Sequence, residues 1–395
     1  MYVIEKIKIM KKVFYWSPHI DKVATVKAVI NSAYSLKLYS KKIYEPYIIN
    51  VAGEWDEYEA DLKNKGIHLI KLTNSNIIKN RNIKGFIRSR LIYFYVFFIS
   101  FFPLIKLLKQ TSPEYFIIHL ITPIPLLINY FFKFKTKFIL RISGYPKLSK
   151  LRFFIWKLTL KKILFITCPT LATKDRLVDL NFVNKDKLFV LYDPIISSKT
   201  IMSEKNDKSQ KMDINFNNFF MAAGRLTKQK NFLFLIDAFK DFNVGGLQKL
   251  VILGDGEEKN ILNKYIKDNN LENSIYLLGY KKNIFKYFDK AKCFILSSLW
   301  EDPGFVIVEA SYMNLFVIAS DCKNGPKEIL DNGNNGILYK SNNKEALVNS
   351  LKSYINTSEK EINLKKKLLK NKIKNFTIFN HYNKLMQILK DDHNE

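Results

Sequence analysis

The chain has 395 residues, of which 47% are hydrophobic, and this composition predicts two domains with real cores and excludes a disordered protein. Its 64 Lys and Arg residues outnumber its 36 Asp and Glu residues, which gives a formal net charge of +28. The three cysteines, Cys168, Cys293 and Cys322, lie too far apart for a zinc motif, and unpaired thiols are typical of a reducing compartment.

Short apolar runs alternate with helical patterns along the whole chain. The first half has strand candidates at 12–17, 47–51, 67–72, 115–120, 137–142, 164–168 and 188–192, and helix candidates at 22–39, 147–162 and 173–180. The second half has strand candidates at 219–223, 249–253, 275–278, 292–296 and 316–319, and helix candidates at 231–242, 259–269, 284–290 and 304–313. This alternation predicts βαβ units and parallel sheets.

Two long apolar runs lie in the first half, at 91–105 and 115–132. Both are shorter than the roughly 20 residues of a spanning helix, and both contain proline, so we interpret them as buried strand and helix. For 91–105, a helix lying in the membrane interface is the alternative. The flanks of that run are basic, at Arg88, Arg90, Lys106 and Lys109. Residues 1–13 have no apolar core, so we expect no signal peptide.

The excess positive charge is concentrated in one segment. Residues 62–174 hold 21 basic side chains and one acidic side chain, Glu114, whereas residues 175–395 hold 34 basic and 27 acidic ones. A positive charge excess of this size predicts a partner that carries negative charge. The candidates are nucleic acid, an anionic membrane surface and a charged substrate. Because no recognised DNA- or RNA-binding motif occurs, we expect no nucleic-acid partner.

The polar stretch 197–213 predicts a linker between two domains. We therefore expect an N-terminal domain over 1–196, a C-terminal domain over 214–375, and a helix over 376–395 that packs back on the first domain. Both domains are expected to be doubly wound α/β domains of the Rossmann type. Parallel sheets bind ligands beyond the carboxyl ends of their strands, so two domains facing across a cleft would hold a ligand between them.

The stretch WEDPGFVIVEA at 300–310 follows a predicted strand and opens a predicted helix. Asp302 is a suitable N-cap residue, and Pro303 suits the first helical position. A helix start at this place offers free N–H groups to an anion, and Gly304 allows a phosphate to approach the backbone closely.

Two pairs of charged residues lie near these strand ends. Glu301 precedes the predicted helix, and Glu309 lies inside it. Glu301 and Glu309 are separated by about 9 Å of helix rise, so they address different parts of one extended ligand. Arg225 and Lys230, in GRLTKQKN at 224–231, follow a strand and suit a diphosphate. The alternative for Arg225 and Lys230 is two ordinary surface cations.

Together these stretches resemble the retaining glycosyltransferases of family 4, which have the GT-B fold. The resemblance implies that the domain over 214–375 binds the nucleotide sugar and that the domain over 1–196 is the acceptor-side domain. In the first domain, the stretches PHIDKVAT and RISGYPKL are similar to enzymes of bacterial surface-polysaccharide assembly. The resemblance to family 4 covers about 219–340. It rests on the order of the motifs GRLTKQKN, LVILGDGEE, IYLLGY, FILSSLWEDPGFVIVEA, VIASD and NGPKEIL. The paired glutamates with seven residues between them, Glu301 and Glu309, match the family's signature.

The resemblance implies a role for each charged residue of this site. Arg225 and Lys230 match the basic pair that holds the donor's diphosphate, and Glu301 matches the glutamate near the transferred sugar. These three are the expected catalytic residues. Glu309 matches the glutamate that accepts hydrogen bonds from the ribose hydroxyls.

The resemblance also implies contacts made by the backbone. Gly304, Phe305 and Val306 match the segment whose N–H groups bind the sugar and phosphates. Gly279 and Tyr280 lie where the nucleotide base usually rests.

Because the sequence has no Asp-x-Asp motif, we expect no metal and no cofactor. The co-substrate is expected to be a UDP- or GDP-linked sugar. Its transfer is expected to retain the configuration of the anomeric carbon.

The first domain departs from the family pattern. The loop at 17–30 has no glycine, and Ser143 precedes Gly144 where the family often has a histidine. His19, His119 and Ser143 are therefore the acceptor-side candidates, although a lone histidine is more often structural.

The expected function is transfer of a sugar to a lipid-linked or polysaccharide acceptor in capsule or lipopolysaccharide assembly. The enzyme is expected to be peripheral, on the inner face of the cytoplasmic membrane, with its basic first domain drawn to an anionic surface. The alternatives are a non-catalytic homologue that tethers a partner or membrane, and an enzyme of the same fold that acts as a sugar-nucleotide epimerase or a phosphorylase.

Overall fold

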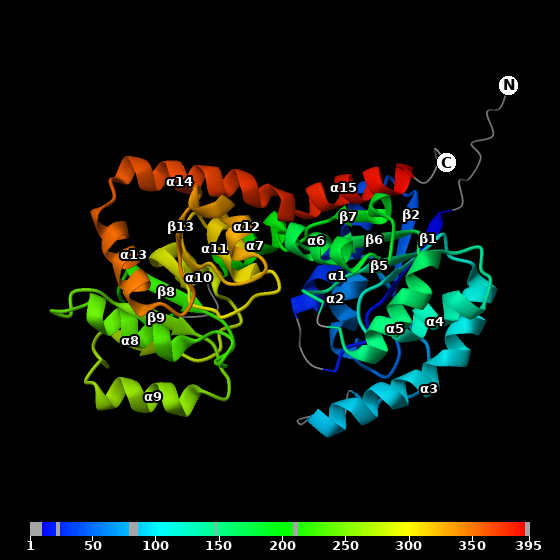
Figure 1. Cartoon of the computed structure of the whole chain (residues 1–395), viewed down its shortest axis with the longest axis horizontal. Coiled ribbons are helices and arrows are strands. Elements are labelled where there is room, and N and C mark those ends of the chain that lie inside the picture. The colour runs from blue at the N-terminus through cyan, green and yellow to red at the C-terminus, as the bar shows by residue number, and fades with distance from the viewer. Residues whose placement is uncertain (1–9, 21–23, 79–85, 147, 208–211, 392–395) are drawn as a thin grey trace. The chain divides into compact units, whose positions relative to one another are not determined.

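The structure is a computed structural model of the chain, and it describes residues 10–20, 24–78, 86–146, 148–207 and 212–391. The chain divides into two compact units, which are described separately (Figure 1). The first unit comprises Met1–Pro194 and Ile378–Glu395, and the second comprises Ile195–Thr377.

The first unit is built on a parallel sheet with the strand order β3-β2-β1-β4-β5-β6-β7. Its strands are β1 (Lys11–Trp16), β2 (Tyr44–Asn50), β3 (His68–Lys71), β4 (Tyr115–Ile118), β5 (Lys137–Arg141), β6 (Phe165–Cys168) and β7 (Leu188–Val190). Its α-helices are α1 (Ala24–Tyr39), α2 (Glu59–Asn64), α3 (Phe86–Thr111), α4 (Pro123–Phe131), α5 (Lys150–Thr159), α6 (Leu171–Leu180) and α15 (Ile378–Asp391).

Alternation along the strands gives this sheet two hydrophobic faces. Phe14 and Trp16 of β1 point into a core that includes buried residues of α3, α4 and α5. Val13 and Tyr15 point to the other face, into a core shared with α1 and α15. The final helix α15 therefore covers the same face of the sheet as α1.

The second unit is built on a parallel sheet with the order β10-β9-β8-β11-β12-β13. Its strands are β8 (Phe219–Ala223), β9 (Leu250–Leu253), β10 (Ile275–Leu277), β11 (Ala291–Leu296), β12 (Phe316–Ser320) and β13 (Ile337–Tyr339). Its α-helices are α7 (Ser198–Asn206), α8 (Phe232–Phe242), α9 (Lys259–Asp268), α10 (Phe285–Lys290), α11 (Phe305–Tyr312), α12 (Pro326–Ile329), α13 (Lys344–Asn356) and α14 (Glu359–Lys372).

The predicted strands are all present, and the predicted pair of doubly wound α/β domains is confirmed. Strand ends differ from the prediction by three residues or fewer. The short strand β13 was not predicted.

The prediction of a linker over 197–213 is wrong where the structure forms α7. This helix buries Ile201, and it packs on α10 through a salt bridge of 2.6 Å between Lys205 and Asp289. The Asn283 side-chain amide also donates to the Glu204 carbonyl. Tertiary contacts thus order a polar segment that has little hydrophobic periodicity of its own.

The prediction that the run 91–105 is buried is wrong for much of its surface. Within α3, the segment Arg90–Thr111 is long and apolar enough to cross a membrane, yet only 33% of its most apolar stretch is buried inside the protein. One face of α3, with Val96 and Leu104, lies in the core of the sheet, while Phe98 and Phe102 on the other face are 72% and 75% exposed. The side chain of Arg88 lies outside the described residues.

Candidate functional site

The candidate donor site lies at the carboxyl edge of the second unit's sheet. β8 pairs with β9 on one side and with β11 on the other, so the strand order reverses between β8 and β11. The loops that follow neighbouring strands diverge at such a reversal and leave a crevice where ligands bind.

The loop after β8 is tied to the loop after β11 by hydrogen bonds. The Leu299 N–H donates to the Gln229 carbonyl at 2.8 Å, and the Gln229 side-chain amide donates to the Trp300 carbonyl at 2.9 Å. The Ser297 hydroxyl donates to the Lys230 carbonyl at 2.7 Å. These bonds hold GRLTKQKN against the WEDPGF loop.

Lys230 and Glu301 form a salt bridge where these loops meet. The Lys230 Nζ lies 2.6 Å from the Glu301 Oε1, and the two side chains are 15% and 5% exposed. The Ser298 hydroxyl donates to the same carboxylate oxygen. Because both charged groups are buried, each needs the opposite charge of the other beside it, and this requirement fixes the relative position of the two side chains. The predicted residues Lys230 and Glu301 are thus brought together.

The predicted start of the following helix is wrong. Gly304, with a φ of 93°, is the N-cap of α11, and Phe305 is its first residue. Asp302 and Pro303 therefore precede the helix. The Asp302 carboxylate instead accepts a hydrogen bond of 3.1 Å from the Asn324 side-chain amide. The N-cap residue has a left-handed backbone conformation, which glycine adopts easily. The helix therefore begins later in the sequence than the Asp-Pro pattern predicts.

Close backbone packing shapes the WEDPGF loop from the side of β12. Gly325 has a φ of 122°, and a Cβ on it would lie 1.8 Å from the Pro303 carbonyl oxygen. The Glu301 N–H donates to the Lys323 carbonyl at 3.2 Å. The first N–H groups of α11, from Phe305 and Val306, have no partner within their helix and are available to an anion.

A second close approach joins the loops after β8, β9 and β10. A Cβ on Gly254 would lie 1.8 Å from the Gly224 carbonyl oxygen, and the Gly254 N–H donates to the Gly279 carbonyl at 2.9 Å. Gly279 therefore lies at the same sheet edge as GRLTKQKN. Tyr280, which follows it, is 73% exposed.

The other predicted donor residues lie on these same loops. Arg225 is exposed, and among the described residues no carboxylate forms a salt bridge with it. Glu309 is half-buried on α11, in the turn that follows Phe305 and Val306. The described residues contain no group of three or more His, Cys, Asp or Glu side chains that could hold a metal ion.

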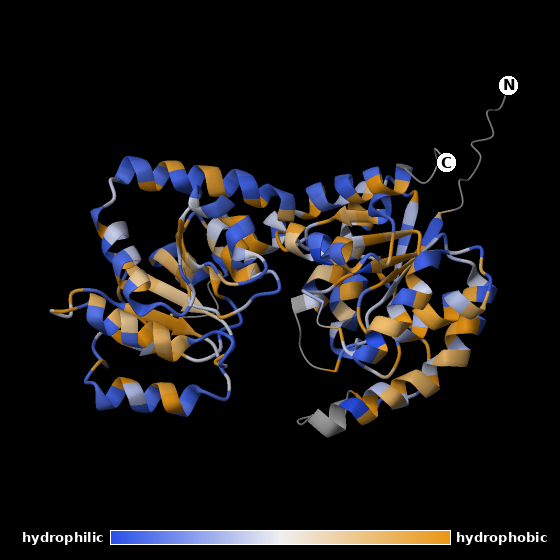
Figure 2. Ribbon diagram, viewed as in Figure 1, coloured by the Kyte–Doolittle hydropathy of each residue, from blue (hydrophilic) through white to orange (hydrophobic). Residues whose placement is uncertain are grey.

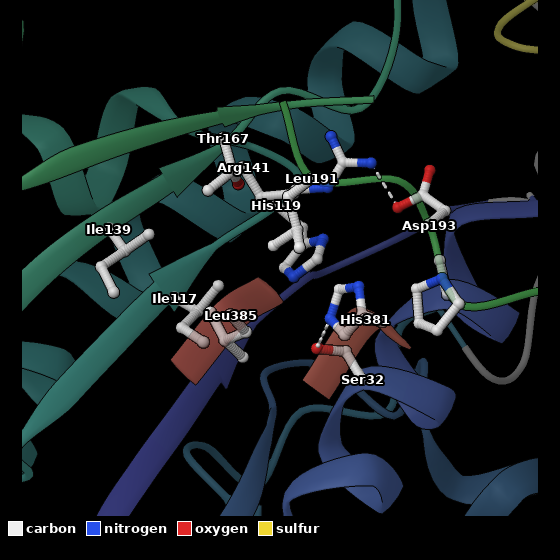
Figure 3. A pocket seen from close by; sticks show the side chains of 12 residues that line it. Ser32, Ile117, His119, Ile139, Arg141, Thr167, Leu191, Asp193, His381 and Leu385 are labelled. Atoms are coloured by element: carbon white, nitrogen blue, oxygen red, sulfur yellow. Dashed lines mark hydrogen bonds and ion pairs between the residues drawn. The ribbon is translucent and has the colours of Figure 1, made fainter. Parts of the chain in front are cut away.

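The acceptor-side candidates lie in the first unit, at the carboxyl ends of its strands. His119 follows β4, and its carbonyl accepts a hydrogen bond of 3.2 Å from the Ser143 hydroxyl after β5. The His119 side chain is 5% exposed and points into a small cavity inside the first unit (Figure 3). It therefore faces the interior of the unit.

That cavity holds a polar cluster beneath α1 and α15 (Figure 3). Arg141 forms a buried salt bridge with Asp193, and His381 of α15 accepts from or donates to the Ser32 hydroxyl at 2.9 Å. The His119 Nε2 has no hydrogen-bond partner among the residues that the structure describes. Burial is the main cause that lowers the pKa of His119 well below its ordinary value, and the neighbouring Arg141 and His381 lower it further.

His19 is held apart from that cluster, against an aromatic side chain. Its ring packs edge-on against Trp55 with the ring centroids 4.9 Å apart, and its Nδ1 lies 3.3 Å from the Ser17 carbonyl. Burial lowers the pKa of His19, so its neutral form is favoured. Nearby, the buried Glu54 carboxylate accepts the N–H groups of Val51 and Ala52.

Sequence reasoning did not single out the residues that position Glu301. Ser298 donates to its carboxylate and Gln229 ties the two loops together, yet both are ordinary polar residues within quoted motifs. Asn324 and Gly325 lie in NGPKEIL, and the Asn-Gly-Pro order was the available signal for a tight turn at this place.

Two doubly wound units with reversed strand order define the GT-B class of protein, and the predicted GT-B fold is confirmed. Residues 204–373 match the family model described as glycosyl transferases group 1. The resemblance to family 4 glycosyltransferases is thereby confirmed.

Relatives of known sequence and structure agree with this assignment. The chain is 35% identical over 248 residues, 58% of this chain and 61% of the relative, to an uncharacterized glycosyltransferase of Methanocaldococcus jannaschii. It is 34% identical over 137 residues, 35% of this chain and 37% of the relative, to the N-acetylgalactosamine-N,N'-diacetylbacillosaminyl-diphospho-undecaprenol 4-alpha-N-acetylgalactosaminyltransferase of Campylobacter jejuni. The chain thus spans less than two thirds of the length of these curated relatives. The structure of Anabaena HepE in complex with UDP matches with a TM-score of 0.71 and 17% identity, over 97% of this chain and 100% of HepE.

Proposed function

We propose that the protein is a retaining, metal-independent glycosyltransferase. It moves a sugar from a UDP- or GDP-linked donor to a lipid-linked or polysaccharide acceptor in cell-surface glycan assembly. The observation that carries the proposal is the buried contact between Lys230 and Glu301, which joins the loops after β8 and β11 beside the start of α11.

The charges at this edge suit the chemistry of the transfer. The bond between the anomeric carbon and the diphosphate oxygen breaks, and that oxygen keeps the electron pair. The acceptor hydroxyl forms the new bond to the same carbon and loses its proton. Positive groups placed where the negative charge develops stabilise such a transition state. Lys230, Arg225 and the N–H groups of Phe305 and Val306 supply them without a metal.

The carboxylates have separate roles in this proposal. Glu301, oriented by Ser298 and Lys230, accepts hydrogen bonds from the hydroxyls of the transferred sugar. Glu309, further along α11, accepts them from the ribose. The base lies over Gly279 and beside the exposed ring of Tyr280.

The acceptor proposal is supported by the relatives. The Campylobacter jejuni relative carries diphospho-undecaprenol in its name, and HepE was solved with UDP. A lipid-linked acceptor requires an enzyme that works at a membrane, so we place the protein at the inner face of the cytoplasmic membrane.

The test is transfer of a radiolabelled sugar to a membrane fraction, after mass spectrometry has selected the donor. Lys230→Ala and Glu309→Ala are expected to reduce transfer about 100-fold, because each removes a charge that faces the donor. Lys228→Ala is the matched control, since Lys228 is an exposed lysine of the same loop. Full activity in both site variants contradicts the proposal. Failure to bind UDP and GDP in calorimetry would instead indicate a non-catalytic homologue.

A further inference from the structure

Three helices on one face of the first unit expose an unusual combination of side chains. α3 packs on α4 and α4 packs on α5, and all three cover the core that contains Phe14 and Trp16. We call their exposed surface the three-helix face. Figure 2 shows hydrophobic residues running along α3 and α4.

The apolar part of the three-helix face is contributed mainly by α3. Leu91, Phe94, Tyr95, Phe98 and Phe102 recur at helical spacing, and Phe94, Phe98 and Phe102 are 65%, 72% and 75% exposed. The neighbouring helices add the exposed side chains of Phe131, Leu151 and Phe154. An exposed apolar patch of this kind marks an interaction surface.

The same three helices and their ends also carry many exposed cations. The exposed basic residues of the three helices and of their ends are Arg90, Lys106, Lys109, Lys133, Lys135, Lys150, Arg152, Lys157, Lys161 and Lys162. Between residues 90 and 162 the sequence contains one acidic residue, Glu114. That residue precedes β4 and pairs with Lys11 at 3.2 Å. The face therefore combines exposed aromatics with a large excess of basic over acidic side chains.

We propose that the three-helix face docks the protein on an anionic lipid bilayer, with the exposed stripe of α3 buried in the interface and the lysines at the headgroups. This inference rests on the proposed function and names its membrane surface. Phe and Leu on one side and Lys or Arg around them are the pattern of helices that lie in a membrane interface.

Insertion of α3 across the bilayer does not fit the structure. Val96, Leu104 and Leu108 on the opposite side of the helix are at most 1% exposed, and they pack in the core of the unit. A spanning α3 would have to leave that core. If α3 lies in the interface, its core-facing side chains stay buried in the protein, and its exposed apolar side chains are buried in the lipid.

A second copy of the chain is a poorer occupant. A two-fold interface places the same patch of both copies together. The lysines of one copy would then lie against the lysines of the other, with no carboxylates to compensate them. Anionic lipid supplies the missing charge.

The experiment is co-sedimentation of the full chain with vesicles of phosphatidylcholine alone or of phosphatidylcholine with phosphatidylglycerol. We expect binding to the anionic vesicles that weakens with salt. Lys106→Gln with Lys109→Gln is expected to lower the partition coefficient about 25-fold, about fivefold for each lysine. Phe98→Ser with Phe102→Ser is expected to lower it about tenfold or more.

Val244→Ser with Leu247→Ser is the matched control. Both residues are 86% exposed but lie in the second unit, so this variant is expected to bind vesicles as the wild type does. Unchanged binding of either three-helix variant overturns the proposal, and so does an equal loss in the control. A dimer in sedimentation equilibrium that Phe98→Ser with Phe102→Ser abolishes also overturns it, in favour of a second copy.

UDP and GDP titration separates this inference from the proposed function. The three-helix variants are expected to bind the nucleotide as the wild type does, because their residues lie outside the second unit. Nucleotide binding without vesicle binding overturns the docking surface alone. Vesicle binding that depends on the three-helix face, in a chain that binds no nucleotide, overturns the proposed function alone.

Discussion

Lys230 and Glu301 are 71 residues apart in the sequence, and their side chains meet at 2.6 Å in the second unit. Lys230 follows β8 and Glu301 follows β11, two strands that pair directly. The contact therefore holds the loop after β8 against the loop after β11, at the point where the strand order reverses. Because the pair is buried, loss of only one of its two charges is expected to lower stability as well as the proposed transfer.

Removing one charge of this pair is expected to destabilise the fold. Lys230→Met leaves a buried carboxylate without its cation, which costs about 3 kcal/mol in the free energy of unfolding, measured with urea. Lys230→Met combined with Glu301→Gln is expected to restore most of that loss but no transfer activity. Lys205→Ala removes an exposed pair of the same unit and is expected to cost less than about 1 kcal/mol. Equal losses in Lys230→Met and Lys205→Ala would disprove this assignment.

A methyl group on Gly325 is expected to displace the WEDPGF loop. Gly325→Ala places a Cβ 1.8 Å from the Pro303 carbonyl oxygen, so the backbone must move. Gly245→Ala is the control, because Gly245 also has a positive φ, of 96°, yet its Cβ would have no atom of the described residues within 4 Å. Both substitutions carry about 1 kcal/mol of backbone strain. Only Gly325→Ala is expected to lower the melting temperature further and to weaken UDP binding several-fold. The idea fails if the two variants behave alike.

Stability is expected to fall in mild acid because of the buried histidines of the first unit. Burial lowers the pKa of His381 to about 4, and it lowers the pKa of His119 well below its ordinary value. The same side chains titrate near 6.5 in the unfolded chain. Between about pH 6.5 and pH 4 the unfolded state binds more protons, so the stabilisation is present above 6.5 and is lost as the pH falls. The loss attributable to His381 is about 3 kcal/mol.

Glu54 acts in the opposite direction over part of this range. Burial raises its pKa to about 7, so the folded state binds the extra proton and Glu54 lowers stability as the pH rises toward 7. Urea unfolding at several pH values separates the two effects. His381→Gln is expected to flatten the dependence between pH 4 and 6.5, and Glu54→Gln to steepen it. An unchanged profile in His381→Gln would refute the assignment.

The last helix is expected to stabilise the unit at the opposite end of the sequence. Leu385 of α15 is 2% exposed and lies in the core shared with α1. Leu385→Ala is expected to cost about 2–4 kcal/mol and to increase proteolysis within the first unit. Leu364→Ala, at a position of α14 that is 56% exposed, is expected to change neither. Cleavage that increases only in the second unit would contradict the prediction.

Most of the fold could be predicted because buried parallel strands form continuous apolar runs. β8, for example, has the sequence FFMAA and is buried throughout, and the predicted range is the observed one. The helix ends were less predictable. Asp302 and Pro303 have the sequence of a helix start. In the structure Gly325 packs closely against Pro303, and Gly304 is the N-cap residue instead. α7 was missed because its order comes from contacts with α10.

The site was predictable only as a set of residues. Local sequence and the family motifs named Lys230, Glu301 and Glu309, since charge and glycine spacing are properties of the chain itself. Which of them touch depends on the pairing of β8 with β11, and this long-range relationship leaves no local signal. His119 shows the same limit. It stands among apolar residues in the sequence, and only the tertiary structure places it beside His381 of the last helix, where both line an interior cavity. Hydrophobic periodicity specifies which residues leave water, and the pairing of distant strands and helices specifies which of them meet.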